Sequence, residues 1–169
     1  MPSNNSKNAR WSLYPELHAD VDSILQPALS FKFNHEDTDK GVEESYRTNV
    51  VGTFTCQNPK CKGSTWTSGV IPIIIRMYSN NRYNARVYYQ QCRRCRRACV
   101  PTLDQTYAER VAYRIKKWRG IFVEAKRYFT KGTPPHRDDL CYGCKAGTCL
   151  KAARFVPQLF VVSSTDPRE

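Results

Sequence analysis

Residues 68–95 read "SGVIPIIIRMYSNNRYNARVYYQQCRRC", and this stretch decides the predicted fold. The runs "SGVIPIIIRMY" and "RYNARVYYQQ" are rich in β-branched and aromatic residues, and the polar "SNN" separates them. Two such runs around a polar turn predict an antiparallel β-hairpin. The second run leads directly into Cys92 and Cys95, so the hairpin also predicts where these two thiols lie.

A second cysteine pair precedes the hairpin. Cys56 and Cys61 stand before its first run, so folding the hairpin back brings both pairs together at its base. Four thiolates around one ion predict a closed, structural zinc site, because zinc accepts tetrahedral sulfur ligands without strain. The spacing in "CRRC" is typical of a zinc knuckle, whereas "CQNPKC" has a longer gap. Reduced cysteines without a metal are the alternative.

Residues 134–149, "PPHRDDLCYGCKAGTC", predict a second metal site. One histidine and three cysteines follow the pattern H-x4-C-x2-C-x4-C, and short gaps of this kind suit a self-contained Cys₃His zinc loop. The predicted ligands are His136, Cys141, Cys144 and Cys149. Taken alone, His136 would read as a surface loop residue. The sequence therefore predicts two structural zinc ions as cofactors.

Cys99 is left over from both ligand sets. It could substitute as a ligand in the first site, pack as a small buried hydrophobic residue, or be a free thiol.

The N-terminal third predicts one helix and two strands. Residues 14–29, "YPELHADVDSILQPAL", form an amphipathic pattern with prolines placed to start and stop a helix. Residues 29–34 and 45–56 alternate as strands do, and the acidic loop 35–44 between them is expected to be solvated.

A further helix is predicted at 106–120, "TYAERVAYRIKKWRG", after the second cysteine pair. Thr106 and Glu109 have the spacing of a capping box, and Gly120 suits a helix C-terminus. Residues 154–162 suggest a final strand. These elements predict an α+β fold, a small antiparallel β-sheet that binds zinc, with an N-terminal helix and one later helix.

The chain divides into three predicted parts. Residues 1–55 form an N-terminal helix and strands packed on the zinc domain, 56–151 form the zinc domain, and 152–169 form a C-terminal strand or tail. The net charge of +12 is uneven, since residues 56–151 hold twenty Lys and Arg against five Asp and Glu. A basic segment of this density favours anionic partners, of which nucleic acid is the commonest.

Alternation along the hairpin places arginines and tyrosines on the face opposite its isoleucines. Cations interleaved with flat rings suit single-stranded RNA, because phosphates bind guanidinium groups and unpaired bases stack on aromatic planes. The alternative is a polar sheet face whose tyrosines pack on arginines. The hairpin residues predicted for RNA contact are Arg76, Tyr78, Arg86 and Tyr88.

Further cations follow the hairpin. The four arginines of "CRRCRRAC" could offset the negative charge of a zinc–thiolate centre or bind an external anion. Basic residues on the 106–120 helix add to the predicted RNA surface. These cations are Arg93, Arg94, Arg96, Arg97, Arg110, Arg114 and Lys117.

Three quoted stretches together, "FTCQNPKCKGSTWTSG", "RVYYQQCRRC" and "PPHRDDLCYGCKAGTC", resemble the 3CxxC-type zinc-finger family. This family includes fungal proteins, animal receptor-transporting proteins and zygote arrest proteins, and "RWSLYPELHADV" is similar to the fungal members. The resemblance implies a zinc-binding, β-rich domain, with RNA binding in some members and assistance to receptor trafficking in others. Cys56 and Cys61 depart from the family's CxxC spacing by two residues.

Other classes of function are less well supported by the sequence. Asp138 and Asp139 beside His136 are the nearest candidates for a general base, but both metal shells look complete, so we expect no enzyme and no small-molecule substrate. No apolar run is long enough to span a membrane. The polar N-terminus has no apolar stretch of the kind a signal peptide contains, which favours an intracellular protein of the cytoplasm or nucleus. A protein-binding adaptor or chaperone, docking through the N-terminal helix and acidic loop, is the alternative function.

Overall fold

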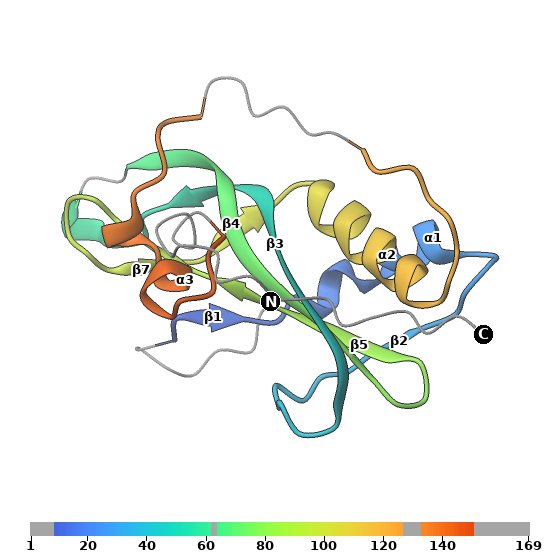
Figure 1. The fold of residues 1–169 in the computed structure, drawn as a ribbon. Coiled ribbons are helices and arrows are strands. Elements are labelled where there is room, and N and C mark those ends of the chain that lie inside the picture. The colour runs from blue at the N-terminus through green and yellow to red at the C-terminus, as the bar shows by residue number, and fades with distance from the viewer. Residues whose placement is uncertain (1–8, 62–63, 127–132, 151–169) are drawn as a thin grey trace, which may run out of the picture.

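The computed structural model describes residues 9–61, 64–126 and 133–150, and it shows a six-stranded sheet, antiparallel except for one parallel pair, with the two longest helices on one side (Figure 1). The strand order is β1-β5-β4-β3-β8, and β2 also pairs with β5. The strands are β1 (Trp11–Ser12), β2 (Lys32–Phe33), β3 (Val42–Thr55), β4 (Thr65–Tyr78), β5 (Arg82–Tyr88) and β8 (Pro101–Leu103). β6 (Gln90–Gln91) and β7 (Ala98–Cys99) form a separate two-stranded ribbon. The predicted α+β class with an antiparallel sheet is confirmed.

The predicted hairpin is β4 and β5, joined by residues 79–81. Its register pairs Ile73 with Val87 and Tyr78 with Arg82. Asn80 and Asn81 have φ values of 61° and 51°, a left-handed conformation that asparagine tolerates better than most residues. The "SNN" sequence therefore supplies a tight turn that aligns the two strands.

Helices α1 (His18–Leu25) and α2 (Thr106–Trp118) contact each other and cover one face of the sheet (Figure 1). Each contributes an apolar stripe, and the sheet contributes alternate side chains of β4 and β5, because these point to one face. The centre of this core consists of Val21, Leu25, Ile71, Ile73, Ile75, Val87, Val111 and Ile115, all at most 1% exposed. Both predicted helices are confirmed.

The N-terminus of α2 differs from the predicted capping box. Thr106 lies inside the helix, and its hydroxyl donates to Asp104 Oδ1, so it does not cap Glu109. Asp104 Oδ1 also accepts from the Thr106 backbone N–H at 2.8 Å, and the Thr106 hydroxyl accepts from the Val51 N–H at 2.9 Å. These contacts tie the helix start to β3, and the capping-box prediction is wrong because a distant strand takes the hydroxyl.

The acidic loop 35–44 is largely exposed, as expected, but it is also tied to the sheet by ion pairs. Asp37 Oδ1 lies 2.7 Å from Arg76 Nη2 and 2.7 Å from Arg86 Nη2, and Asp39 Oδ1 lies 2.9 Å from Arg76 Nη1. The Trp11 indole N–H also donates to Asp37 at 2.8 Å. The loop therefore covers the polar face of the hairpin, and β3 begins within it at Val42.

The remaining short elements are helical turns, and three of them lie at or beside cysteines. The 3₁₀ turn η2 (Pro59–Cys61) follows β3, while η3 (Asp138–Leu140) and α3 (Tyr142–Lys145) carry the last cysteine group. A further 3₁₀ turn, η1 (Pro15–Leu17), precedes α1. The strand predicted at 154–162 lies outside the described residues. No helix among the described residues is long and apolar enough to cross a membrane.

Candidate metal centres

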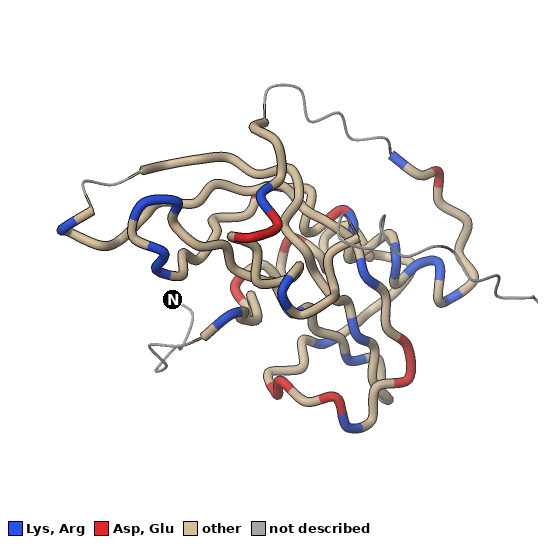
Figure 2. The backbone as a smooth tube through the Cα atoms, turned by 60° about the vertical axis from the view of Figure 1, so that its left-hand side comes forward, with Lys and Arg blue, Asp and Glu red and all other residues tan. Residues whose placement is uncertain are grey.

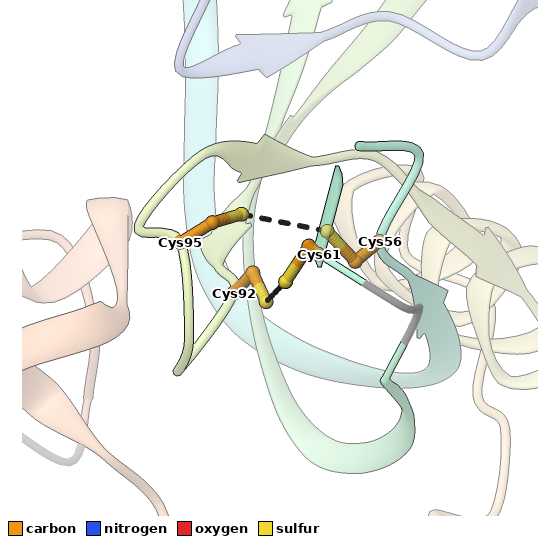
Figure 3. Close-up of side chains that lie close together, drawn as sticks. All are labelled: Cys56, Cys61, Cys92 and Cys95. Carbon is orange, nitrogen blue, oxygen red and sulfur yellow. Dashed lines mark hydrogen bonds between the residues drawn. The ribbon is translucent and has the colours of Figure 1, made fainter. Parts of the chain in front are cut away.

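The first centre lies where β3 ends and the β6–β7 ribbon turns, and its four cysteine side chains point toward one another (Figure 3). Sγ of Cys56 lies 3.6 Å from Sγ of Cys95, and Sγ of Cys61 lies 3.7 Å from Sγ of Cys92. A tetrahedron with zinc–sulfur bonds of about 2.3 Å has sulfur–sulfur edges of about 3.8 Å. The four thiols therefore have the separations that a bound zinc ion requires.

The turn 92–97 positions the second cysteine pair. The Cys92 N–H donates to the Arg97 carbonyl at 2.9 Å, and the Arg96 N–H donates to the Cys92 carbonyl at 2.9 Å. Arg96 closes the turn with a φ of 60°. On the other side, the Cys61 N–H donates to the Asn58 carbonyl at 2.9 Å, which folds the longer "CQNPKC" gap into a 3₁₀ turn. That turn explains how a gap of four residues still presents both sulfurs to one point.

The local electrostatics favour a thiolate at Cys92. Burial acts to raise its pKa, but hydrogen bonds from the Ser64 hydroxyl and from the backbone N–H groups of Cys95 and Arg94 lower the pKa to about 6. Burial and the neighbouring thiols raise the pKa of Cys61 to about 12. Four thiols in such contact cannot all ionise without a cation, and zinc supplies that positive charge. Sequence reasoning missed Ser64, which carries no signal beyond standing three residues after Cys61.

The second centre is built by the 134–149 loop, whose predicted ligands also converge. Nε2 of His136 lies 3.2 Å from Sγ of Cys144 and 3.7 Å from Sγ of Cys149. Nitrogen and sulfur ligands of tetrahedral zinc are about 3.6 Å apart. The Cys144 N–H donates to Sγ of Cys141 at 3.4 Å, which suits a zinc-bound thiolate. A zinc ion therefore fits here as well, with three sulfurs and one nitrogen.

In each centre, the four ligand atoms lie within 4.8 Å of one another. The two sets are those expected from spacing, Cys56, Cys61, Cys92 and Cys95, and then His136, Cys141, Cys144 and Cys149. Residues 49–147 match the model of the 3CxxC-type zinc-binding domain.

The chain belongs to the 3CxxC-type zinc-binding domain family. The match covers both ligand sets except Cys149, which completes the second centre two residues beyond it. Comparison with curated proteins and with solved structures gives no match.

Cys99 is not a ligand of this zinc-binding domain. It lies in the hydrophobic core, 3% exposed, and its thiol lies 3.6 Å from the Arg97 carbonyl. Burial and the nearby thiols of Cys56 and Cys92 raise its pKa to about 12, and its sulfur belongs to neither ligand set. Of the three possibilities left open by the sequence, packing as a buried residue is the one observed.

The two centres are joined to each other in the fold. Gln90 forms a bridge with Cys141, and the Tyr142 N–H donates to the Tyr89 carbonyl at 3.1 Å. Arg96 of the 92–97 turn also pairs with Asp139 of the second loop at 3.2 Å. The second zinc loop is therefore docked on the strand that leads into the first centre.

Four residues predicted for RNA contact lie on the hairpin face, and the structure buries or engages all of them. Arg76 is 2% exposed beneath Asp37, and Tyr78 is 2% exposed with its hydroxyl on the Thr38 carbonyl. Tyr88 is 3% exposed and packs on Trp11, while Arg86 pairs with Asp37. The prediction of an exposed cation–tyrosine surface here is wrong, because the acidic loop and β1 cover that face.

The basic residues of α2 are also partly engaged. Arg110 Nη1 donates to the Thr48 hydroxyl at 3.0 Å, and the Arg114 guanidinium lies 3.2 Å from the Tyr46 ring centroid. Lys117 is exposed, and its ammonium lies 5.7 Å from the Tyr113 ring centroid. Two of the three cations predicted on this helix therefore contact side chains of β3.

The arginines of the 92–97 turn remain at the surface. All four side chains are exposed, and Arg96 alone among them has an ion-pair partner within the described part of the chain. Figure 2 shows Lys and Arg at the loops of the first centre on the left, while Asp and Glu gather in the loop at the bottom. Arg93, Arg94 and Arg97 thus supply accessible positive charge beside the first centre.

Proposed function

We propose that this zinc-binding protein binds single-stranded RNA through the exposed arginines of the 92–97 turn. The observation that carries the proposal is that Arg93, Arg94 and Arg97 are exposed and have no ion-pair partner among the residues described. Guanidinium groups held on a rigid turn suit phosphate oxygens, which they bind through paired hydrogen bonds. Five acidic residues lie in the separate loop 35–44, whereas Asp139 pairs with Arg96 of the turn itself.

The zinc ions have a structural role in this proposal. Each centre offers four protein ligands, which leaves no coordination position for a reacting water, so we propose that the protein is not an enzyme. The first ion holds the arginine turn in place, because Cys92 and Cys95 are ligands within that turn. A four-thiolate zinc centre carries a net charge near −2, and four arginines beside it exceed the charge needed to balance it.

The resemblance of the quoted motifs to the 3CxxC-type family, in which some members bind RNA, supports RNA as the anionic partner. We also propose that the protein is related to the fungal members of the family, because "RWSLYPELHADV" is similar to their sequences. Among the described residues every cysteine is a free thiol or a metal ligand, which fits a reducing compartment such as the cytoplasm or nucleus.

Salt-dependent binding tests the proposal. The triple variant Arg93→Ala, Arg94→Ala, Arg97→Ala should weaken binding to unrelated single-stranded RNAs alike, since phosphate contacts carry no sequence information. Each phosphate contact contributes about −0.7 to the slope of log K against log salt, so losing three should flatten the slope by roughly 2 units.

A matched control removes the same charge elsewhere. Lys32, Lys40 and Arg119 are exposed near the hairpin turn, at the other end of the sheet from the first centre, and their replacement by Ala should leave the slope nearly unchanged. Every variant must first be shown to hold two zinc ions, because the arginines flank ligands.

An equal loss of affinity in both triple variants would show that net charge, and not the turn, attracts RNA. Unchanged RNA binding in the arginine variant would show that these side chains only balance the negative charge of the thiolates. In that case a protein-binding adaptor becomes the better function, and partners retained after nuclease treatment in a pull-down would support it. Phe122, which is 94% exposed beyond α2, is the most exposed large apolar side chain among the described residues and is available to such a partner.

A further inference from the structure

A pocket of about 460 Å³ lies between the two metal centres. Three segments form it: the start of β4, the stretch from Gln90 to the arginine turn, and the second zinc loop before Cys141. His136, a ligand of the second centre, lines the pocket, and Arg93 and Arg94 stand beside Cys92 of the first. A volume of this size is typical of sites for one small ligand. The pocket therefore exists only where both zinc centres are folded.

The wall of the pocket includes a fixed aromatic side chain. Trp66 stacks on the buried Phe54, with ring centroids 5.1 Å apart and planes 12° apart. Its indole N–H donates to Gln90 Oε1 at 3.0 Å, and Gln90 Nε2 in turn donates to the Ser68 hydroxyl at 3.0 Å. These contacts hold the indole in one orientation before any ligand arrives, which reduces the entropy that binding would cost.

The rim of the pocket is positive. Arg93 and Arg94 line it and are exposed, and Arg137 lines it while Asp139 holds its guanidinium through two hydrogen bonds of 2.9 Å. Among the described residues, no Asp or Glu lines this pocket. An apolar, aromatic wall beneath a cationic rim suits a flat ring attached to phosphate.

A second cavity, of about 310 Å³ beside α2, is less suited to a base. Its lining includes Tyr46 and Arg114, but the Arg114 guanidinium already lies 3.2 Å from the centre of the Tyr46 ring. The ring face is thus occupied by the protein's own cation. Glu109 and Glu124 also line that cavity and would repel phosphate.

We propose that the pocket between the metal centres receives one base of a single-stranded RNA, placed against Trp66 with the flanking phosphates on Arg93 and Arg94. This inference rests on the proposed RNA binding and adds the site and the type of contact. Stacking on an aromatic side chain accepts any base, so the pocket favours single strands over duplexes without reading sequence strongly.

The test compares two octamers of equal charge, octauridylate and an octamer with the same sugar–phosphate backbone but hydrogen in place of each base. The zinc-loaded wild type should bind octauridylate more tightly than the baseless strand. Trp66→Leu should reduce this preference by roughly ten- to hundred-fold, the range of one lost stacking contact. The arginine triple variant should weaken binding to both octamers and keep the preference.

Trp118→Leu is the matched control, since Trp118 is also a partly buried indole packed on the core but does not line the pocket. It should keep the wild-type preference. If Trp66→Leu keeps the preference while the arginine variant still loses affinity, RNA binding stands and the pocket assignment is overturned. If the wild type binds neither octamer, both proposals are overturned.

Fluorescence provides a readout that does not depend on how the Leu variant folds. With Trp11→Phe and Trp118→Phe, Trp66 is the remaining tryptophan of the chain, which has three. Octauridylate should quench its emission, and the baseless octamer should quench it far less at equal saturation. Emission that stays constant while octauridylate binds would overturn the proposal.

Discussion

Cys92 and Cys99 show how one residue type takes two roles at equal burial. Cys92 is fully buried and Cys99 is 3% exposed. Burial acts to raise both pKa values, yet hydrogen bonds from Ser64 and two backbone N–H groups lower that of Cys92 to about 6, whereas that of Cys99 rises to about 12. Cys92 belongs to the first ligand set, whereas Cys99 lies in the hydrophobic core beside the Arg97 carbonyl and outside both ligand sets.

Cys99→Ala should therefore retain two zinc ions and lose only about 1–2 kcal/mol of stability through the lost packing. Cys92→Ala should lose one ion, because the first centre is left with three ligands. Native mass spectrometry of the two variants measures the zinc content directly. One ion in the Cys99 variant would mean that Cys99 takes part in the first centre.

Asp37 is the residue that holds the acidic loop on the sheet. Although burial acts to raise its pKa, hydrogen bonds from Arg86, Arg76 and Trp11 lower the pKa below the ordinary value of 3.8. A carboxylate with a lowered pKa contributes stability above its unfolded pKa, and this stability is lost as the pH falls through the folded value. Above about pH 5 the contribution should therefore be complete.

Asp37→Asn should destabilise the protein by about 2 kcal/mol, since Arg76 is buried and would keep only Asp39 as a charged partner. Denaturant unfolding of both proteins should give the same difference in free energy at pH ~7 and pH ~5.5. A difference that shrinks between these two values would show that the carboxyl titrates there, contrary to its lowered pKa.

Two elements meet closely where the second zinc loop contacts β4. A Cβ atom added at Gly143 would lie 2.5 Å from Cγ and 2.7 Å from Cβ of Pro72, closer than side-chain atoms approach. Pro72 stands opposite Asn49 in the register of β3 and β4. Gly143 thus lets α3 lie directly on the sheet, and this contact complements the bridge between Gln90 and Cys141.

Gly143→Ala should loosen the second zinc loop at a cost of about 1–3 kcal/mol, the range for overpacking, while all eight ligands remain. One zinc ion should then pass to a competing chelator faster than in wild type. Gly147→Ala is a control in the same loop, because space is open there and its φ of 70° adds strain of only about 1 kcal/mol. Equal release from both variants would mean that loop strain, and not the contact with Pro72, limits zinc loss.

At the scale of the whole molecule, the two zinc centres lie at one end of the sheet and depend on each other unequally. The second loop docks on residues 89–91, which lead into Cys92, whereas β3 and β4 reach the first centre without passing through the second loop. Loss of the first ion should therefore weaken zinc binding at the second centre. Loss of the second ion should leave zinc binding at the first centre unchanged.

Cys144→Ser should keep one zinc ion, whereas Cys95→Ser should lose one ion and also hold the other more weakly. Zinc in small sites contributes on the order of 10 kcal/mol of folding free energy, so even partial coupling should change chelator sensitivity measurably. Zinc-release titrations of the two single variants make the comparison. Equal retention of the remaining ion would show that the centres fold independently.

The sequence by itself determined the ligand sets, the hairpin and α2, because these follow from spacing and periodicity within short stretches. The pairs Cys56/Cys61 and Cys92/Cys95 needed only the hairpin to meet, and the pattern from His136 to Cys149 needed only its own loop. The apolar stripe of α2 repeats every three or four residues, which identifies a helix wherever it packs.

Only the tertiary structure decided which cations are accessible. Alternation correctly placed Arg76 opposite the isoleucines, but it could not reveal that Asp37, 39 residues away, covers that face. The Thr106 hydroxyl was diverted in the same way by Val51, 55 residues away. The pocket around Trp66 likewise joins three separate segments. Ion pairs and cavities depend on residues that packing brings together from distant parts of the chain. A pattern within a short stretch of sequence contains no information about those residues.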